Sequence, residues 1–404
     1  MNPENLKALI FSPLILRNIT LKNRILRSAT YEGLADSDGY PQPGLEKIYK
    51  ALADGGVGTI ITGFCFVSRD GRAMQPRQCG MESDSKIPGW RKIVSNVKKT
   101  SGGVSVFMQI AHSGRQTRHE STGMPVLGVS SRKCSYFKQE VHVLDNGTIL
   151  RLADDFASAA FRAKEAGFDG VQIHAAHGYL IHQFLSPWTN TRKDRWADKT
   201  LFLDSVICEI RRKCGDSYPI LVKLSSAEDT DPGINLESTI RIVRKLEERK
   251  IDAVEISYGT MEYALNIIRG DCPVNTVLQK NPLFNRFHPL ILKAWKLLFL
   301  KKYLTRLIKY EDCYNIKAAE AVRKETSLPV IAVGGIRSLS NMDKCLNSGG
   351  LDGIGLCRPL ICEPDFTEKI RNGASECSLC INCNLCTVHS DTTNPVHCYQ
   401  NKGI

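Results

Sequence analysis

The chain has 404 residues, of which 42% are hydrophobic and 24% are charged, a composition typical of a globular protein large enough for one big domain or two smaller ones. No apolar stretch is long enough to span a bilayer, and the chain does not begin with a basic segment followed by an apolar run; the sequence therefore predicts neither an integral membrane protein nor a secretion signal. Fifteen cysteines without such a signal indicate a reducing, cytoplasmic compartment, where thiols stay reduced or bind metal.

The excess of positive charge is concentrated in one segment. The formal net charge is +12, and seven of the excess charges lie between residues 283 and 310, which contain no Asp or Glu. A protein that binds nucleic acid over a broad surface needs basic residues across that surface, whereas the rest of this chain is only mildly basic. We therefore expect no nucleic-acid partner.

Short apolar runs alternate with helical patterns along the chain, which predicts repeated βα units and a parallel sheet. Eight runs have the length and composition of buried strands: 24–28, 57–63, 104–110, 168–174, 219–225, 251–257, 328–333 and 351–357. The helical patterns between them include residues 45–53, 152–166, 201–213, 236–249 and 316–326. Eight strands are the number that a closed (β/α)8 TIM barrel needs. The alternative, a doubly wound sheet, favours a G-x-G-x-x-G turn after an early strand, and the sequence has none.

Several segments extend this barrel. An N-terminal cap precedes the first strand, and a long connection over residues 116–149 contains the turn signal Asp145-Asn146-Gly147. An insert at about 283–312, between the sixth and seventh strands, mixes large apolar residues with lysines. This composition suits a broken helical lid on the barrel or a weak peripheral contact with a membrane, and we expect the lid. The barrel is predicted to span residues 1–375, followed by a cysteine-rich tail over residues 376–404.

The fourth predicted strand leads directly into two imidazoles and a phenol. His174 ends this strand, and His177 and Tyr179 follow it, at the carboxyl end of a strand where an α/β barrel keeps its chemistry. Two histidine donors with a tyrosine nearby suit a site that binds a carbonyl oxygen and delivers a proton. The structural alternative, two hydrogen-bonded core histidines and a core tyrosine, explains less well why three polar side chains follow one strand so closely.

Other strand ends carry a cation or glycine turns. Lys223 closes the fifth strand, where a buried cation needs either a bound anion or a structural ion pair. Glycines follow the seventh and eighth strands at Gly334, Gly335 and Gly355, and Arg358 comes directly after the last of them. Barrels often bind phosphate at these two loops, where glycine lets the backbone approach and arginine adds a bidentate partner.

The tail contains cysteines at regular spacing. Cys377, Cys380, Cys383 and Cys386 recur every third residue, and Cys398 follows after eleven more. Thiolates spaced in this way hold iron–sulfur clusters, and four of them would also fit a zinc ion. We take Cys380, Cys383, Cys386 and Cys398 as candidate metal ligands, with Cys377 as the alternative first ligand. A 4Fe–4S cluster is preferred to zinc, and free thiols are the third interpretation.

Several separated motifs resemble the Old Yellow Enzyme family of FMN-dependent oxidoreductases. The resemblance covers nearly the whole chain and is densest over the segment that begins at His174. The matching segments are residues 11–14, 21–25, 55–62, 109–115, 174–187 and 358–360. The tail is similar to the cluster-binding region of the 2,4-dienoyl-CoA reductase and trimethylamine dehydrogenase branch, where the usual order is C-x2-C-x3-C; here the second spacing is one residue shorter.

The resemblance implies a flavin site built from the predicted strand ends. The small residues Ser28, Ala29 and Thr30 would lie against FMN, and Gln109, whose amide both donates and accepts, would meet the pyrimidine edge of its ring. Lys223 would lie near N1–C2=O of the flavin, a place where many members have Arg; Lys keeps the charge and loses the planar fork. The phosphate is expected at Gly334, Gly335, Gly355 and Arg358.

The resemblance also implies the reaction. NAD(P)H would reduce the flavin, which would pass hydride to a small activated alkene or enone. His174 and His177 would hold the carbonyl oxygen of this substrate, and Tyr179 would donate the proton. A flavin or quinone reductase or an NADH oxidase would use the same flavin residues without a proton donor, and an FMN-dependent tRNA-modifying barrel would need a catalytic cysteine and an RNA-binding appendage. The sequence leaves open the substrate, the choice of NADH or NADPH, and whether the protein is a homo-oligomer.

Overall fold

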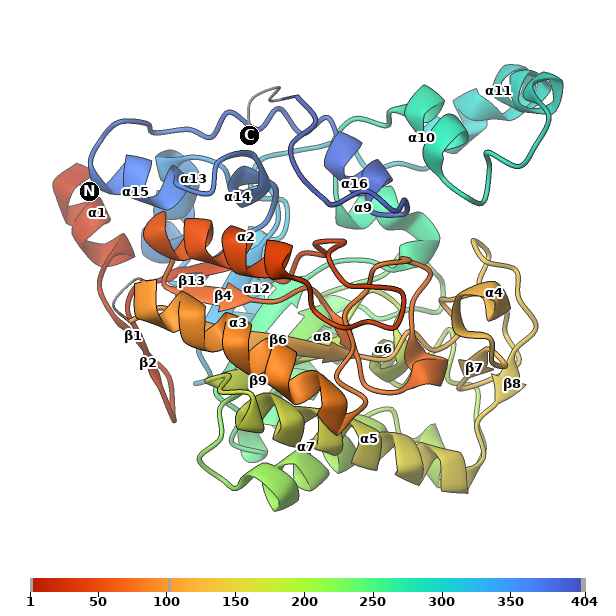
Figure 1. Cartoon of the computed structure of the whole chain (residues 1–404), viewed down its shortest axis with the longest axis horizontal. Helices are drawn as coiled ribbons and strands as arrows, with labels where there is room; N and C mark the ends of the chain where they lie inside the picture. Colours follow the sequence, from red (N-terminus) through yellow and green to blue (C-terminus); the bar gives the residue numbers. More distant parts are fainter. Residues whose placement is uncertain (1–2, 101–102, 401–404) are drawn as a thin grey trace.

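The computed structural model describes residues 3–100 and 103–400, and its centre is a closed parallel barrel (Figure 1). Each barrel strand neighbours the next in chain order: β3 (Ile25–Arg27), β4 (Thr59–Ile61), β6 (Ser105–Ala111), β9 (Gly170–Ala175), β10 (Ile220–Ser225), β11 (Ala253–Ser257), β12 (Val330–Val333) and β13 (Gly353–Leu356). The parallel pairing of β13 with β3 closes the ring, and a short strand, β5 (Cys65–Phe66), pairs with the end of β6. The predicted (β/α)8 barrel and its eight strands are confirmed.

Amphipathic helices cover the outside of the barrel. They are α2 (Pro43–Asp54), α3 (Ile87–Thr100), α5 (Asn146–Glu165), α7 (Leu201–Cys214), α8 (Leu236–Glu248) and α12 (Ile316–Arg323). In α5, Ile149, Leu152 and Phe156 are buried at the three- and four-residue spacing of one helix face. The helix ends just before Gly167, which adopts a left-handed φ of 90° that favours glycine.

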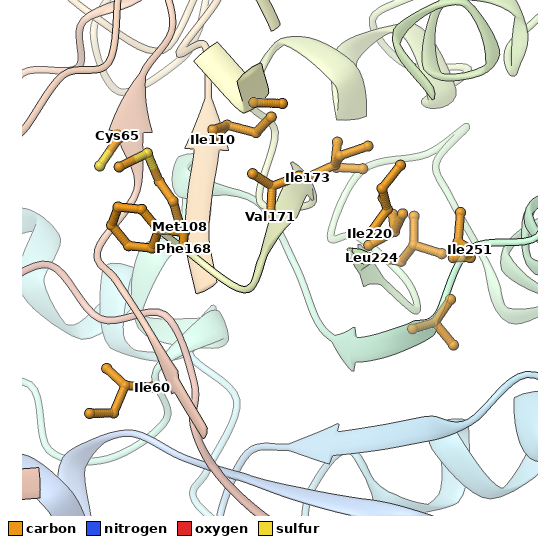
Figure 2. Close-up of a cluster of buried hydrophobic side chains, with 14 of the residues drawn as sticks. Ile60, Cys65, Met108, Ile110, Phe168, Val171, Ile173, Ile220, Leu224 and Ile251 are labelled. Atoms are coloured by element: carbon orange, nitrogen blue, oxygen red, sulfur yellow. The ribbon is translucent and has the colours of Figure 1, made fainter. Parts of the chain in front are cut away.

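Two hydrophobic layers position the carboxyl ends of the strands. The larger layer joins the outward-facing strand residues to the helices, and Figure 2 shows some of these strand side chains, including Met108, Val171 and Ile220. The smaller layer fills the lower barrel interior and contains Leu26, Ile61, Phe107, Leu221, Ala253 and Ile331. The strands β1 (Leu14–Ile15) and β2 (Thr20–Leu21) close this lower end, because Leu14 and Leu21 pack into the same layer. The opposite end of the barrel is left for polar side chains.

The remaining described α-helices and strands lie in the connections and at the chain ends. They are α1 (Pro3–Ile10), α4 (His119–Thr122), β7 (Leu127–Gly128), β8 (His142–Val143), α6 (Leu180–Leu185), α9 (Ala264–Ile267), α10 (Val274–Lys280), α11 (Pro289–Leu304), α13 (Leu339–Asp343), α14 (Arg358–Cys362), α15 (Phe366–Arg371) and α16 (Leu385–His389). Within the residues that the structure describes, no helix is long and apolar enough to cross a membrane.

The long connection before α5 ends in a helix start, where its sequence predicts a turn. The carboxylate of Asp145 accepts a hydrogen bond from the backbone N–H of Thr148 at 2.6 Å and caps the first turn of α5. Asp and Asn side chains make the same local hydrogen bond in turns and at helix starts. The signal Asp145-Asn146-Gly147 therefore marks the beginning of a helix.

The insert between β11 and β12 also differs from its prediction. Residues Pro289–Leu304 form one continuous helix, α11, where a broken helix was expected. Its leucines and lysines favour a helix, and neither Gly nor Pro interrupts its interior. No residue of α11 is buried, and the helix lies at one end of the molecule, away from the barrel (Figure 1). Helix α11 itself is therefore not a lid packed on the barrel.

Candidate active site

A cavity of about 250 Å³ opens at the carboxyl ends of the barrel strands. It brings together nearly all the residues that the sequence predicts as catalytic or flavin-binding: Ala29, Thr30, Gln109, His174, His177, Tyr179, Lys223, Gly334, Gly335, Gly355 and Arg358. Ser28 is the exception, because it is buried behind the cavity wall and does not line it.

The turn after β9 brings the two histidines and the tyrosine into contact distance. His177 and Gly178 both adopt left-handed conformations, with φ of 61° and 78°, so the chain reverses sharply after the strand. The rings of His174 and His177 lie 5.0 Å apart between centroids, and those of His174 and Tyr179 lie 4.9 Å apart. Three polar side chains from one short segment therefore converge on one point of the cavity.

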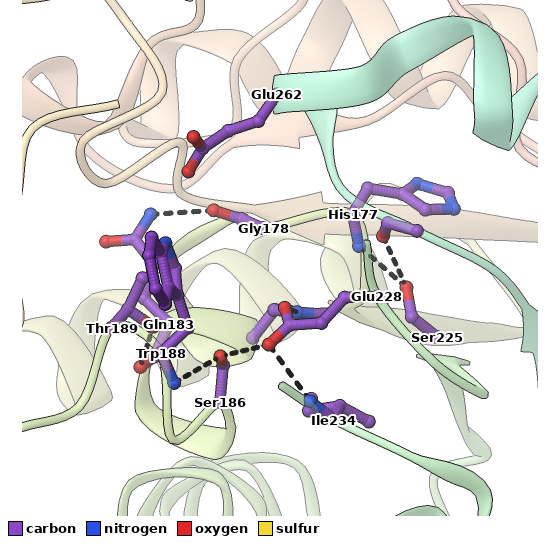
Figure 3. Close-up of polar contacts among 12 residues, drawn as sticks. His177, Gly178, Gln183, Ser186, Trp188, Thr189, Ser225, Glu228, Ile234 and Glu262 are labelled. Atoms are coloured by element: carbon purple, nitrogen blue, oxygen red, sulfur yellow. Dashed lines mark hydrogen bonds and ion pairs between the residues drawn. The ribbon is translucent and has the colours of Figure 1, made fainter. Parts of the chain in front are cut away.

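Hydrogen bonds to neighbouring elements hold this turn in place (Figure 3). The backbone N–H of His177 donates to Ser225 Oγ at 3.0 Å, and Gln183 Nε2 donates to the carbonyl of Gly178 at 2.8 Å. Helix α6, which follows Tyr179, is tied to the loop after β10 because Ser186 Oγ donates to Glu228 at 2.5 Å. The position of Tyr179 is thus set by contacts with the strand next to its own.

Burial keeps both imidazoles neutral. Desolvation lowers the pKa of His174 and of His177 well below the usual value, and the charge of Lys223 lowers both further. His177 Nε2 lies 2.8 Å from Ser257 Oγ, whereas the buried Nδ1 of His174 has no hydrogen-bond partner. A neutral imidazole offers one N–H donor, so two donors are available without two positive charges.

Burial also keeps the phenol of Tyr179 protonated. Desolvation raises the pKa of Tyr179 above its usual range, and the nearby carboxylate of Asp391 adds to this shift. The phenol is therefore an un-ionised acid at neutral pH. Its ring contacts Phe64 edge to face, with centroids 5.5 Å apart, which fixes its orientation.

A polar layer forms the floor of the cavity, above the apolar lower interior. The strand register places Gln109 beside Gln172, and Lys223 between His174 and Glu255. Gln109 Nε2 donates to Gln172 Oε1 at 2.7 Å, and Gln172 Nε2 donates to Glu255 Oε2 at 2.7 Å. The side chains of Gln109 and Lys223 are thus held from below while they line the cavity.

Lys223 forms an ion pair with Glu255, one of the two alternatives that the sequence left open for this buried cation. Its Nζ lies 3.3 Å from Glu255 Oε1 and donates to Ser28 Oγ at 2.7 Å. Ser28 in turn donates to Glu255 at 2.5 Å. The hydroxyl of Ser28 therefore orients Lys223 and Glu255.

The glycine loops after β12 and β13 bring backbone close to other chain segments. A Cβ at Gly334 would meet the ring of Tyr314 at 2.5 Å, and one at Gly335 would meet the backbone N of Cys313 at 2.6 Å. Arg358 Nη1 donates to Asn384 Oδ1 at 2.7 Å, so its guanidinium is held at the edge of the same cavity. Backbone N–H groups with a fixed arginine can bind a phosphate there.

Four of the tail cysteines line a second, smaller cavity of about 50 Å³: Cys380, Cys383, Cys386 and Cys398. Cys362 lines it too, and burial together with the Cys398 thiol raises the pKa of Cys362 to about 12. Cys377 lies outside this group; it is exposed, and its Sγ accepts from Arg337 Nη2 at 3.7 Å. Over residues 3–100 and 103–400, no three His, Cys, Asp or Glu side chains are arranged as ligands of one metal ion.

Several cavity residues lie outside the sequence motifs. Tyr31, Phe64, Gln75, Tyr136 and Asp391 all line the cavity. Tyr31 directly follows the predicted flavin segment, so its place in the sequence indicates that it lies near the cavity. The other four come from loops and from the tail, whose places in space no local pattern reveals.

Comparison with known proteins gives the family. Residues 9–287 match the family described as NADH:flavin oxidoreductase / NADH oxidase. The chain is 30% identical over 382 residues to an NADH oxidase of Thermoanaerobacter brockii. The matched stretch covers 93% of this chain and 53% of that protein. It is 28% identical over 366 residues to an NADPH dehydrogenase of Bacillus subtilis, covering 89% of this chain and 93% of that protein. The chain thus spans about half the length of the first relative and nearly all of the second.

Solved structures have the same fold. A 2-naphthoyl-CoA reductase in complex with 2-naphthoyl-CoA superposes with a TM-score of 0.79 at 22% identity, over 98% of this chain and 57% of that one. An Old Yellow Enzyme homologue from Zymomonas mobilis superposes with a TM-score of 0.70 at 23% identity, over 93% of this chain and 95% of that one. With the family match extending through most of the barrel, the chain belongs to the NADH:flavin oxidoreductase / NADH oxidase family, that of the Old Yellow Enzyme.

Proposed function

We propose that the protein is an FMN-dependent oxidoreductase that uses NAD(P)H to reduce the activated C=C bond of a small alkene or enone. The observation that carries this proposal is the convergence of His174, His177 and Tyr179 on one cavity that also contains Gln109 and Lys223. Two neutral N–H donors beside a protonated phenol suit a carbonyl conjugated to an alkene.

The chain's own residues fit FMN. The cavity offers an amide at Gln109 and a cation at Lys223 on its floor, which match the polar edge of a flavin ring and its charge when reduced. Ala29 and Thr30 supply a wall of small side chains. Gly334, Gly335 and Arg358 would hold the phosphate. When bound, FMN would accept hydride from the nicotinamide and donate hydride to the alkene.

The catalytic roles follow from the protonation states. His174 and His177 would donate hydrogen bonds to the substrate's carbonyl oxygen, stabilising the negative charge that develops there. Because both imidazoles are neutral, they would polarise the carbonyl without protonating it. Tyr179, whose pKa is raised by burial, would keep its proton until the carbanion forms and then donate it to the alkene carbon.

The substitution Tyr179→Phe tests this assignment. The variant should still be reduced by NADPH, because the phenol is not needed for that step, and should be reoxidised by 2-cyclohexen-1-one about a hundredfold or more slowly. Anaerobic stopped-flow spectroscopy of the flavin measures the two half-reactions separately. Tyr136→Phe, which removes a phenol from another wall of the cavity, is the matched control. Reoxidation at the native rate in Tyr179→Phe would contradict the proton-donor role.

A second enzymatic candidate uses the same flavin residues. The relative from Thermoanaerobacter brockii is named an NADH oxidase, and a flavin or quinone reductase or an NADH oxidase would not need Tyr179. Comparing reoxidation by 2-cyclohexen-1-one, menadione and oxygen distinguishes the two candidates. An ene reductase would be reoxidised fastest by the enone and would lose that preference in Tyr179→Phe. A flavin or quinone reductase or an NADH oxidase would not prefer the enone, and Tyr179→Phe would not change its order of acceptors.

We further propose that the tail holds a 4Fe–4S cluster, with zinc as the alternative. Four thiols line one small cavity, which supports the proposal. Burial raises the pKa values of Cys380 and Cys386, so these two would release their protons on binding a metal. A cluster would supply one-electron transfer. Iron, sulfide and zinc assays on anaerobically purified protein decide between the metals. Cys383→Ser should lose the metal, whereas Cys377→Ser should retain it; metal loss in Cys377→Ser alone, or no metal in the native protein, would contradict the ligand set.

The proposed division of the chain follows from these two sites. We propose that residues 1–375 form the FMN barrel and that residues 376–404 are a tail that carries the metal ligands. Four backbone hydrogen bonds tie described parts of the tail to the barrel, one of them from the N–H of Val396 to the carbonyl of Glu32 at 2.8 Å. The cysteines of the described chain form no disulfide, which supports a reducing, cytoplasmic location.

A further inference from the structure

One end of the large cavity carries a negative charge that the proposed reaction does not use. Asp391, just after α16 in the tail, lines the cavity together with Gln75. Asp391 Oδ1 accepts from Gln75 Nε2 at 2.9 Å, and Oδ2 accepts from Asn281 Nδ2 at 2.7 Å. Both donors are neutral amides, and no Lys, Arg or His of the described chain forms an ion pair with this carboxylate.

Asp391 is partly buried, and it lines the cavity. Burial raises the pKa of Asp391 to about 6. It lies close enough to Tyr31, Tyr136 and Tyr179 for its charge to raise their pKa values as well. A partly buried carboxylate without a cation is costly, so a positively charged group in the cavity would stabilise it.

Gln75 provides a second, independent observation. The residue is 5% exposed, and its Oε1 is buried without any hydrogen-bond partner. Because Nε2 of the same amide donates to Asp391, the carbonyl Oε1 is the atom left over. Because Oε1 is itself enclosed, a ligand in the cavity would meet the carboxylate of Asp391, which Gln75 orients through Nε2.

The walls around these acceptors are aromatic. The rings of Tyr31 and Phe64 lie 5.9 Å apart between centroids, and those of Phe64 and Tyr179 lie 5.5 Å apart. Tyr136 also lines the cavity, and its hydroxyl accepts from Asn281 Nδ2 at 3.0 Å, the same group that donates to Asp391. Ring faces attract cations electrostatically, and the attraction strengthens where water is excluded.

We propose that Asp391 and Gln75 form a subsite for a protonated amino group, so that the substrate is an activated alkene that also carries an alkylammonium group. The carbonyl of such a molecule would lie at His174 and His177 and its ammonium at Asp391, with the alkene between them beside Tyr179. The placement of the alkene rests on the proposed function, whereas the ammonium subsite stands on its own contacts.

Binding of matched probes tests the subsite without catalysis. We would titrate the flavin-loaded protein at pH 8 with 2-phenylethylamine, 2-phenylethanol and 3-phenylpropanoate, which carry a cation, a neutral group and an anion on similar skeletons, and measure Kd by calorimetry. The amine should bind about tenfold or more tightly than the alcohol, with the acid weakest. Equal or tighter binding of the alcohol or the acid would overturn the proposal.

Asp391→Asn assigns the preference to this carboxylate. The variant should lose about tenfold or more of its affinity for the amine and less than about threefold for the alcohol. Glu311→Gln, which removes one exposed charge from a residue that does not line the cavity, should keep the native preference. An amine preference retained in Asp391→Asn would overturn the assignment. Gln75→Met removes the hydrogen bond that orients Asp391 and should also weaken the preference for the amine, which tests the subsite if Asp391→Asn does not fold.

The two proposals fail in distinguishable ways. Amine selectivity without any reduction of enones would leave the subsite and refute the ene-reductase assignment. Enone reduction without amine selectivity would refute the subsite and leave the ene-reductase assignment standing. The two results are independent because the calorimetric measurement does not depend on turnover.

Discussion

At the scale of single residues, the pairing of Lys223 with Glu255 determines how much positive charge a flavin would meet. Nζ of Lys223 lies 3.3 Å from the carboxylate, and both side chains are almost fully buried. A cation that is already paired stabilises an anionic reduced flavin less than an unpaired one does. Glu255 is therefore a positioning residue that also moderates the charge of Lys223.

The substitution Glu255→Gln should raise the flavin midpoint potential. It leaves the charge of Lys223 uncompensated, which favours the reduced, anionic flavin by about 30 mV or more, or about 1.4 kcal/mol for two electrons. Anaerobic reductive titration against a reference dye measures the potential. Glu248→Gln, an exposed change on α8, should leave it unchanged. A lower potential in Glu255→Gln would contradict this account.

The same residues show the limits of prediction from sequence. His174, His177 and Tyr179 could be predicted because they stand close together after one strand. Gln172 and Glu255, which hold Gln109 and Lys223, belong to other strands and become neighbours only through the barrel register. No local pattern in one chain contains that register, so these partners had to come from the structure.

At the scale of elements, the start of α5 has a measurable contribution to stability. Asp145 caps this 20-residue helix through its hydrogen bond with the N–H of Thr148. Asp145→Ala should lower the urea midpoint of unfolding, because the N–H of Thr148 loses its acceptor, whereas Asp145→Asn, which keeps an acceptor, should lower it much less. Urea unfolding followed by circular dichroism measures the difference. Equal losses in the two variants would show that the hydrogen bond is not what matters.

The elements were predicted far better than their surroundings. Apolar runs bounded by helix ends identify barrel strands because both faces of each strand are buried. The connections follow no such rule. Asp145-Asn146-Gly147 opens a helix although it has the composition of a turn, and α11 is continuous although its lysines lie on no single face.

At the scale of the whole molecule, the tail crosses the open end of the barrel and contacts it at widely separated points. The backbone N–H of Leu339 donates to Glu376, that of Asp271 to Asn382, and that of Val396 to Glu32. These contacts join the loops after β12, β11 and β3. The tail's docking depends on residues distant in sequence, and therefore Asp391 and Cys386 could not be predicted as cavity residues.

Cys386 belongs to the walls of both cavities. Arg358 and Ile361 line both cavities as well, so these three residues lie at the boundary between the cavity of His174 and Tyr179 and the cavity of the tail cysteines. A change in the position or chemical state of the Cys386 sulfur alters the shape of both spaces at once. The tail thus supplies, through Cys386, part of the wall that the two cavities share.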